Sequence, residues 1–155
     1  MEAVSNSTVL IFLSKINRLD LLFKKYSRVI VPQHVKEEVL AKDDTGLLND
    51  FIARIQVKKP KTKRDLRIGA GETEAIILCI EEKIKDFLSD DKRARTVARM
   101  LKLNSTGTIG ILLWNLKRKN ITKKECSELV DLLIKEKYFI STELYVQIKK
   151  VICLQ

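Results

Sequence analysis

Short apolar stretches alternate with amphipathic stretches along the chain, and the two patterns predict strands and helices in turn. Short stretches with apolar residues, too brief for a helix, predict strands at 3–5, 28–31, 85–89 and 103–105. Apolar residues at helical spacing predict helices at 19–25, from 32, at 47–55, 69–83, 91–102, 109–119 and 122–135, and from 141 or 142 toward 152. Because strands and helices alternate, the pattern indicates a parallel sheet with helices on both faces.

Three stretches are less regular. Residues 9–13 fit a strand by composition and a helix by spacing; the helical alternative runs to about Lys15 and is capped by Ser7 or Thr8. Residues 43–46 predict a turn. Residues 57–67 carry six basic side chains and a proline, which is typical of a loop: Lys58, Lys59, Lys61, Lys63, Arg64 and Arg67. Such a run is usually a solvated loop, but its place directly before a glycine-rich turn favours contact with an RNA backbone.

The composition indicates one globular domain over residues 1–155. The chain is 45% hydrophobic, which is typical of a protein with a packed core. No apolar run approaches the ~18 residues that cross a bilayer, and the first residues do not resemble a signal peptide. The three cysteines are far apart in the sequence, which indicates a reducing, cytoplasmic setting rather than a zinc site.

The charge balance points to a polyanionic partner. The chain has 30 Lys and Arg against 20 Asp and Glu, a net charge of +10. An excess of this size favours nucleic acid as the partner. The alternative is that the charge serves solubility alone.

Acidic residues at two predicted junctions suggest a metal site. Glu72 precedes Ile76 and Ile80 by one and two helical turns, so it extends the apolar stripe of its own helix. A carboxylate that points toward the core needs compensation, and a hard cation supplies it. Asp90 and Asp91 follow a predicted strand and begin a helix, where open α/β sheets usually bind ligands.

A third acidic candidate lies on the helix that begins at Pro32. At ~100° per residue, Glu38 flanks the inward stripe of Val35 and Val39, whereas Glu37 points out. The alternative is that both glutamates are solvated helix charges. The pair Gly69-x-Gly71 lacks the remaining residues of a dinucleotide fingerprint or a P-loop, so nucleoside triphosphate binding is not predicted.

Together these motifs resemble those of PIN domains, in the branch of VapC-like toxins. The resemblance covers roughly residues 3 to 145. It rests on Val4-Ser5-Asn6-Ser7-Thr8, Val31-Pro32-x-x-Val35-x-x-Glu38-Val39, Gly69-x-Gly71-Glu72-x-Glu74-Ala75-Ile76, Ser89-Asp90-Asp91-x-x-Ala94-Arg95 and Gly107-Thr108-Ile109-Gly110-Ile111.

The resemblance implies a three-layer α/β/α sandwich around a parallel sheet. It implies an acidic cleft for Mg²⁺ or Mn²⁺ that cleaves RNA phosphodiesters, often as the toxin of a toxin–antitoxin pair and often as a homodimer. The acidic positions of the family fall on Asn6, Glu38, Glu72 and Asp91, with Asp90 beside the last. Asn6 departs from the usual aspartate, which removes one negative charge from the site.

These residue types predict a division of roles. Glu72 and Asp91 are expected as direct metal ligands, assisted by Asp90 and Asn6. Glu38 is expected either to support the ligands without touching the metal or to act as a base for the attacking water. Ser7 would orient a ligand or water. The cationic side chains expected to contact RNA are Lys63, Arg64, Arg67 and Arg95. Clustered carboxylates without a cation are expected to have raised pKa values. Two alternatives stay open: a PIN-like fold that binds RNA or a protein without cutting, and a purely structural interaction module.

Overall fold

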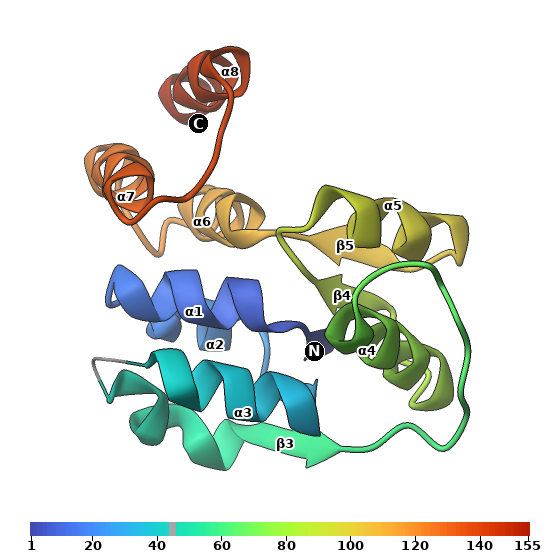
Figure 1. Cartoon of the computed structure of the whole chain (residues 1–155). Helices are drawn as coiled ribbons and strands as arrows, with labels where there is room; N and C mark the ends of the chain where they lie inside the picture. Colours follow the sequence, from blue (N-terminus) through green and yellow to red (C-terminus); the bar gives the residue numbers. More distant parts are fainter. Residues whose placement is uncertain (44–45) are drawn as a thin grey trace.

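A parallel five-stranded sheet in the order β3-β2-β1-β4-β5 forms the centre of the computed structural model, which describes residues 1–43 and 46–155 (Figure 1). The strands are β1 (Glu2–Ser5), β2 (Arg28–Pro32), β3 (Ile55–Lys58), β4 (Asp86–Leu88) and β5 (Asn104–Thr106). The helices are α1 (Ser7–Lys15), α2 (Leu19–Lys25), α3 (Gln33–Lys42), the 3₁₀ helix η1 (Leu47–Arg54), α4 (Ala70–Glu81), α5 (Lys92–Met100), α6 (Thr108–Lys117), α7 (Lys123–Lys135) and α8 (Thr142–Leu154).

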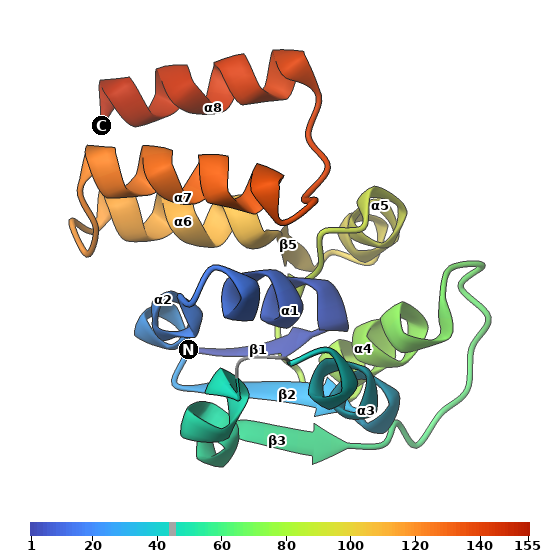
Figure 2. The ribbon, with the colours of Figure 1, turned by 60° about the vertical axis from the view of Figure 1, so that its left-hand side comes forward.

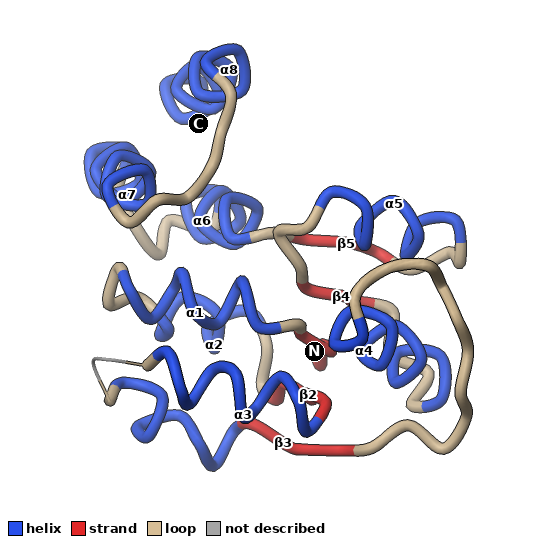
Figure 3. The backbone as a smooth tube through the Cα atoms, viewed as in Figure 1, coloured by secondary structure: helices blue, strands red, loops and turns tan. Residues whose placement is uncertain are grey.

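Alternation along the strands divides the core between the two faces of the sheet. Ala3 and Leu88 are buried in a cluster with residues of α1, α2, α3 and α6. Val4, Ile30 and Phe87 face the other way and pack with α4 and α5. Successive side chains of a strand point to opposite faces, so an apolar strand needs helices on both sides. The predicted α/β/α sandwich is confirmed (Figures 2 and 3).

The last three helices form a stack on one side of the sandwich. α6 packs on α1 and α2, α7 packs on α6, and α8 packs on α7 (Figure 2). α7 begins with a capping box in which Glu125 N donates to Thr122 Oγ1 at 3.1 Å and Thr122 N donates to Glu125 Oε2 at 2.8 Å. Nowhere in the described part of the chain is there a helix with the length and apolar character that crossing a bilayer requires.

One strand was not predicted. Residues 55–58 were expected to end a helix and enter a basic loop, but they form β3, paired with β2 through Val29 opposite Ile55 and Val31 opposite Val57. The preceding residues form a 3₁₀ helix that ends at Arg54. Only pairing with β2 selects the extended conformation, because a four-residue stretch with two charged or polar side chains has little preference of its own. The predicted turn at 43–46 includes residues 44–45, which lie outside the described residues.

The cysteines are unpaired, and two of them are buried. Burial, with the nearby charge of Asp86, raises the pKa of Cys79 to about 12. Burial also raises the pKa of Cys126 to about 11. Cys79 therefore belongs to the core, as predicted, and both buried thiols stay protonated at neutral pH.

Candidate active site at the carboxyl edge of the sheet

The carboxyl ends of β1, β2 and β4 meet at one edge of the sheet, because all three strands run parallel and are neighbours (Figure 2). Asn6 follows β1 directly, and Ser89-Asp90-Asp91 follow β4. The first turns of α3 and α4 are also close, since a Cβ at Gly71 would lie 3.5 Å from Val35 Cγ2. This edge therefore gathers the acidic positions that the sequence singled out.

Asn6 links the ends of β1 and β4 and caps α1. It is 1% exposed, and its Oδ1 accepts hydrogen bonds from Thr8 N at 3.2 Å and from Thr8 Oγ1 at 2.9 Å. Its Nδ2 donates to Ser89 Oγ at 2.7 Å. The prediction that Ser7 or Thr8 caps α1 was therefore wrong: asparagine at the end of a strand supplies the cap. Both ends of the amide are engaged inside the protein, and the role of Asn6 as a metal ligand stays a prediction.

Asp90 is held from three directions. Its Oδ1 accepts from Thr108 N at 2.7 Å and from Tyr138 Oη at 2.8 Å, and its Oδ2 accepts from Thr108 Oγ1 at 2.6 Å. Burial, followed by the charge and hydrogen bond of Asp90, raises the pKa of Tyr138. The carboxylate thus caps α6 and ties it to the segment between α7 and α8. This use of both oxygens favours an architectural role over metal ligation.

Asp91 is arranged differently from its neighbour. The residue is exposed and caps α5, because its Oδ1 accepts from Ala94 N at 2.6 Å. Within the described part of the chain, no other hydrogen bond or ion pair involves its carboxylate. Its backbone N donates to Ser89 Oγ at 3.1 Å. Ser89 therefore contacts both Asn6 and Asp91, a role that the sequence analysis missed although the residue belongs to the quoted motif.

Glu72 has no partner in residues 1–43 and 46–155. The side chain is half-buried in the first turn of α4, and its carboxylate neither accepts a hydrogen bond nor forms an ion pair. It lies over the turn before the helix, where a Cβ at position 69 would collide with Glu72 Oε2, so Gly69 leaves room for it. The predicted apolar stripe is only half right: Ile76 is fully buried, but Ile80, in the last turn of α4, is 41% exposed.

Glu38 and Ser7 connect α3 with α1. Glu38 is exposed, and Lys42 Nζ donates to its Oε1 at 3.0 Å. Burial pushes the pKa of Glu38 upward, but hydrogen bonds from Lys42 and Ser7 outweigh it, so this pKa lies below the usual value. The raised pKa expected for a clustered carboxylate is therefore wrong for Glu38, because its neighbours are donors rather than other acids.

The predicted RNA-binding residues fall in two places. Lys63, Arg64 and Arg67 are exposed on the loop between β3 and α4. Arg95 lies on α5, and its guanidinium Nη1 would come within 3.3 Å of a Cβ at Gly107. Its Nε is buried and has no hydrogen-bond partner among the described residues. Among the described residues, Arg95 forms no ion pair with the carboxylate of Asp91, which caps its own helix.

The carboxylates at this edge are compatible with a magnesium site that has only one or two protein ligands. Among residues 1–43 and 46–155, no three His, Cys, Asp or Glu side chains are grouped closely enough to enclose a metal. Mg²⁺ is commonly bound by one or two carboxylates, with waters and substrate phosphates completing its octahedron. Among the four acids singled out at this edge, Glu72 accepts no hydrogen bond from the described residues and Asp91 accepts one, from Ala94 N. These residues fit a cation that is completed by its substrate.

The comparison with family models decides the classification. The model of DUF3368, described as a PIN domain, matches residues 2–152. The chain belongs to this PIN-domain family. PIN domains usually have nuclease activity and generally use divalent metal ions.

The solved structures show the same fold. A PilT N-terminus domain protein from the hyperthermophilic archaeon Sulfolobus solfataricus P2 superimposes with a TM-score of 0.51 and 19% identity, over 75% of this chain and 94% of that one. At this identity the similarity shows the fold alone. The search of curated proteins found no match.

Proposed function

We propose that this PIN domain is an endoribonuclease that depends on Mg²⁺ or Mn²⁺. One observation carries the proposal: at the carboxyl edge of the sheet, Glu72 holds a half-buried carboxylate that has no partner in residues 1–43 and 46–155. Retaining an uncompensated carboxylate in such a place costs stability, and a cation from solution compensates it. The excess of basic residues, a net charge of +10, supports RNA as the substrate.

The residues divide the work as follows. Glu72 and Asp91 would hold the cation, which when bound lowers the pKa of a water and neutralises charge on the phosphate. Glu38 would orient the attacking water as a hydrogen-bond acceptor, because its lowered pKa makes it a weaker base than an unperturbed glutamate. The hydrogen bond from Ser7 orients Glu38 toward α1. Asn6 connects the ends of β1 and β4 through its hydrogen bond to Ser89, and Asp90 fixes the start of α6 through its hydrogen bond from Thr108.

Metal dependence is the first expected result. Purified protein is expected to cleave a pool of labelled single-stranded RNAs with Mn²⁺ or Mg²⁺ and to leave them intact in EDTA. The same cations should raise the melting temperature, because a ligand that binds only the native state stabilises it. Cleavage that continues unchanged in EDTA would contradict the proposed metal site.

A second candidate function is RNA binding without cleavage. The full engagement of Asn6 favours it, since the family's usual carboxylate is replaced by an amide that is already hydrogen-bonded. This candidate predicts RNA affinity that falls with salt but does not respond to EDTA. The absence of cleavage under all metal conditions would favour it over the nuclease.

We also propose that the protein is a toxin that a partner antitoxin restrains, and that it forms a homodimer. The resemblance to VapC-like toxins supports the pairing, and the exposed apolar side chains Leu144, Val146 and Leu154 of α8 offer surface for association. Expression in a bacterial host without a partner is expected to arrest growth, whereas the Glu72→Gln variant is expected not to. Equal growth of both cultures would contradict a toxin role.

A further inference from the structure

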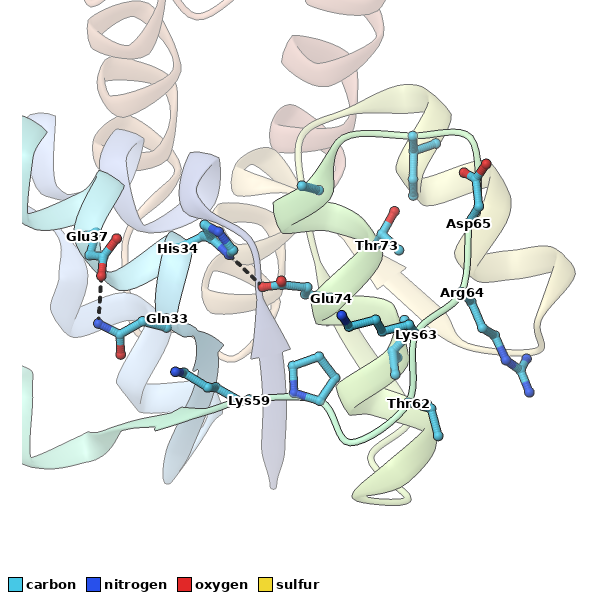
Figure 4. Close-up of a pocket in the computed structure, with 14 residues that line it drawn as sticks. Gln33, His34, Glu37, Lys59, Thr62, Lys63, Arg64, Asp65, Thr73 and Glu74 are labelled. Atoms are coloured by element: carbon cyan, nitrogen blue, oxygen red, sulfur yellow. Dashed lines mark hydrogen bonds and ion pairs between the residues drawn. The ribbon is translucent and has the colours of Figure 1, made fainter.

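A pocket lies between the first turns of α3 and α4 and the loop that joins β3 to α4 (Figure 4). Its volume is about 690 Å³. This is within the roughly 300–1,000 Å³ typical of small-molecule sites, which suits one nucleotide rather than a duplex. We propose that this pocket binds one nucleotide of a single-stranded RNA substrate, with the base on its apolar floor and a phosphate at Lys59 and Lys63. The inference rests on the proposed function, because it extends the substrate-binding surface of that site.

The walls of the pocket combine the two kinds of contact that a nucleotide needs. Pro60, Ile68 and Ile77 supply an apolar surface. Lys59 and Lys63 supply positive charge, and Figure 4 shows Lys63 extending from the loop toward α4. Flat apolar contact holds a base without selecting its sequence, and cations hold its phosphate.

The acidic and the basic side chains of the pocket differ in their contacts with the rest of the protein. Each of its acidic residues is already engaged: Glu74 with His34 at 2.9 Å, Glu37 with Gln33 at 2.8 Å, and Asp65 with the backbone N of Arg67 at 2.9 Å. Its cationic residues Lys59, Lys63 and Arg64 form no hydrogen bond or ion pair within the described residues. Lys59 and Lys63 can therefore engage a phosphate without breaking an existing contact, and hydrogen bonds already occupy the acidic side chains around them.

The pocket adjoins the candidate active site through both helices. His34 and Glu38 are four residues apart on α3, so they are neighbours on one helix surface. On α4, Thr73 lines the pocket and directly follows Glu72. The two first turns lie close together, since a Cβ at Gly71 would be 3.5 Å from Val35 Cγ2, and the hydrogen bond between His34 and Glu74 links the two helices. An RNA strand bound at Glu72 can therefore extend into the pocket.

Thr73→Trp tests the pocket by filling it without a change in charge. Binding of a fluorescein-labelled single-stranded RNA hexamer is measured by anisotropy in EDTA, so that cleavage does not contribute. We expect the affinity to fall about tenfold, or about 1.4 kcal/mol, with no change in its salt dependence, because the indole displaces the base but removes no charge. Thr96→Trp, on the exposed face of α5, is the matched control and should bind as the wild type does.

Lys59→Ala/Lys63→Ala tests the phosphate contacts. We expect weaker binding and a shallower salt dependence, with the slope of log K against log salt reduced by about 0.7 for each lost phosphate contact. Lys85→Ala/Lys117→Ala removes the same charge from exposed positions outside the pocket and should leave the slope nearly unchanged. Circular dichroism and melting temperature establish that each variant is folded.

Competition with nucleoside monophosphates separates an RNA subsite from a site for free nucleotides. The inference is overturned if monophosphates bind in the pocket while RNA binding is the same in Thr73→Trp and wild type. It is also overturned if both pocket variants bind RNA as their controls do. Because these measurements need no cleavage, loss of RNA affinity in the variants supports the pocket even where the nuclease assay fails.

Discussion

Glu72→Gln is expected to lower the rate of metal-dependent RNA cleavage by at least about 100-fold while the protein stays folded. Glutamine keeps the shape of the side chain but removes the negative charge that a cation needs. Charge stabilisation by a metal ion is worth several kcal/mol, and about 3 kcal/mol corresponds to about 100-fold in rate. Because the carboxylate accepts no hydrogen bond within the described part of the chain, its removal leaves no donor unsatisfied.

Two measurements accompany this result. The melting temperature without metal is expected to be unchanged or slightly higher in Glu72→Gln, and its rise on addition of Mn²⁺ is expected to be smaller than in the wild type. Glu128→Gln, an exposed substitution on α7, controls for the loss of one charge and should cleave normally. Wild-type cleavage by Glu72→Gln would remove the residue from the site.

Asp90→Ala is expected to destabilise the fold by about 3 kcal/mol, since it leaves Thr108 N, Thr108 Oγ1 and Tyr138 Oη without an acceptor and each unsatisfied buried donor costs about 1–3 kcal/mol. For a protein of this size, that corresponds to a fall in melting temperature of roughly 6–12 °C. Thermal or urea unfolding followed by circular dichroism measures the effect.

The neighbouring Asp91→Ala is the matched comparison. It removes one helix cap, which costs about 1 kcal/mol, but it should abolish cleavage. Tyr138→Phe removes a single hydrogen bond to Asp90 and is expected to fall between the two in stability. Equal destabilisation by Asp90→Ala and Asp91→Ala would contradict the division into an architectural and a metal-binding aspartate.

The sequence could not predict that Asp90 and Asp91 differ in their hydrogen bonds. Asp90 and Asp91 are adjacent, identical in type and equally placed at the end of a predicted strand, so local pattern treats them alike. Their difference comes from partners far along the chain: Thr108 is 18 residues away and Tyr138 is 48. Tyr138 had no distinguishing pattern, because its role depends on how the segment between α7 and α8 returns to the sheet.

Other features could be predicted because they depend on neighbours in the sequence. The burial of Val35 and Val39 follows from helical spacing, and the cap at Thr122 follows from the capping-box spacing to Glu125. The α/β/α sandwich follows from the alternation of strands and helices, since a parallel sheet that is apolar on both faces needs two helical layers. Helical spacing and strand ends singled out Glu38, Glu72, Asp90 and Asp91 as candidates, and the resemblance to PIN domains added Asn6.

By itself, the sequence determined the order of elements, most of their inward faces and the residue types at the carboxyl edge of the sheet. Only the tertiary structure decided that Ile55–Lys58 is a strand and that Asn6 caps α1. It also decided that Asp90 accepts three hydrogen bonds while Glu72 accepts none from the described residues, and that a pocket lined by Lys59 and Lys63 lies nearby. The physical reason is one of range. Helical periodicity and capping act over a few residues, whereas strand pairing, hydrogen-bond satisfaction and charge compensation depend on groups that only the folded chain brings together.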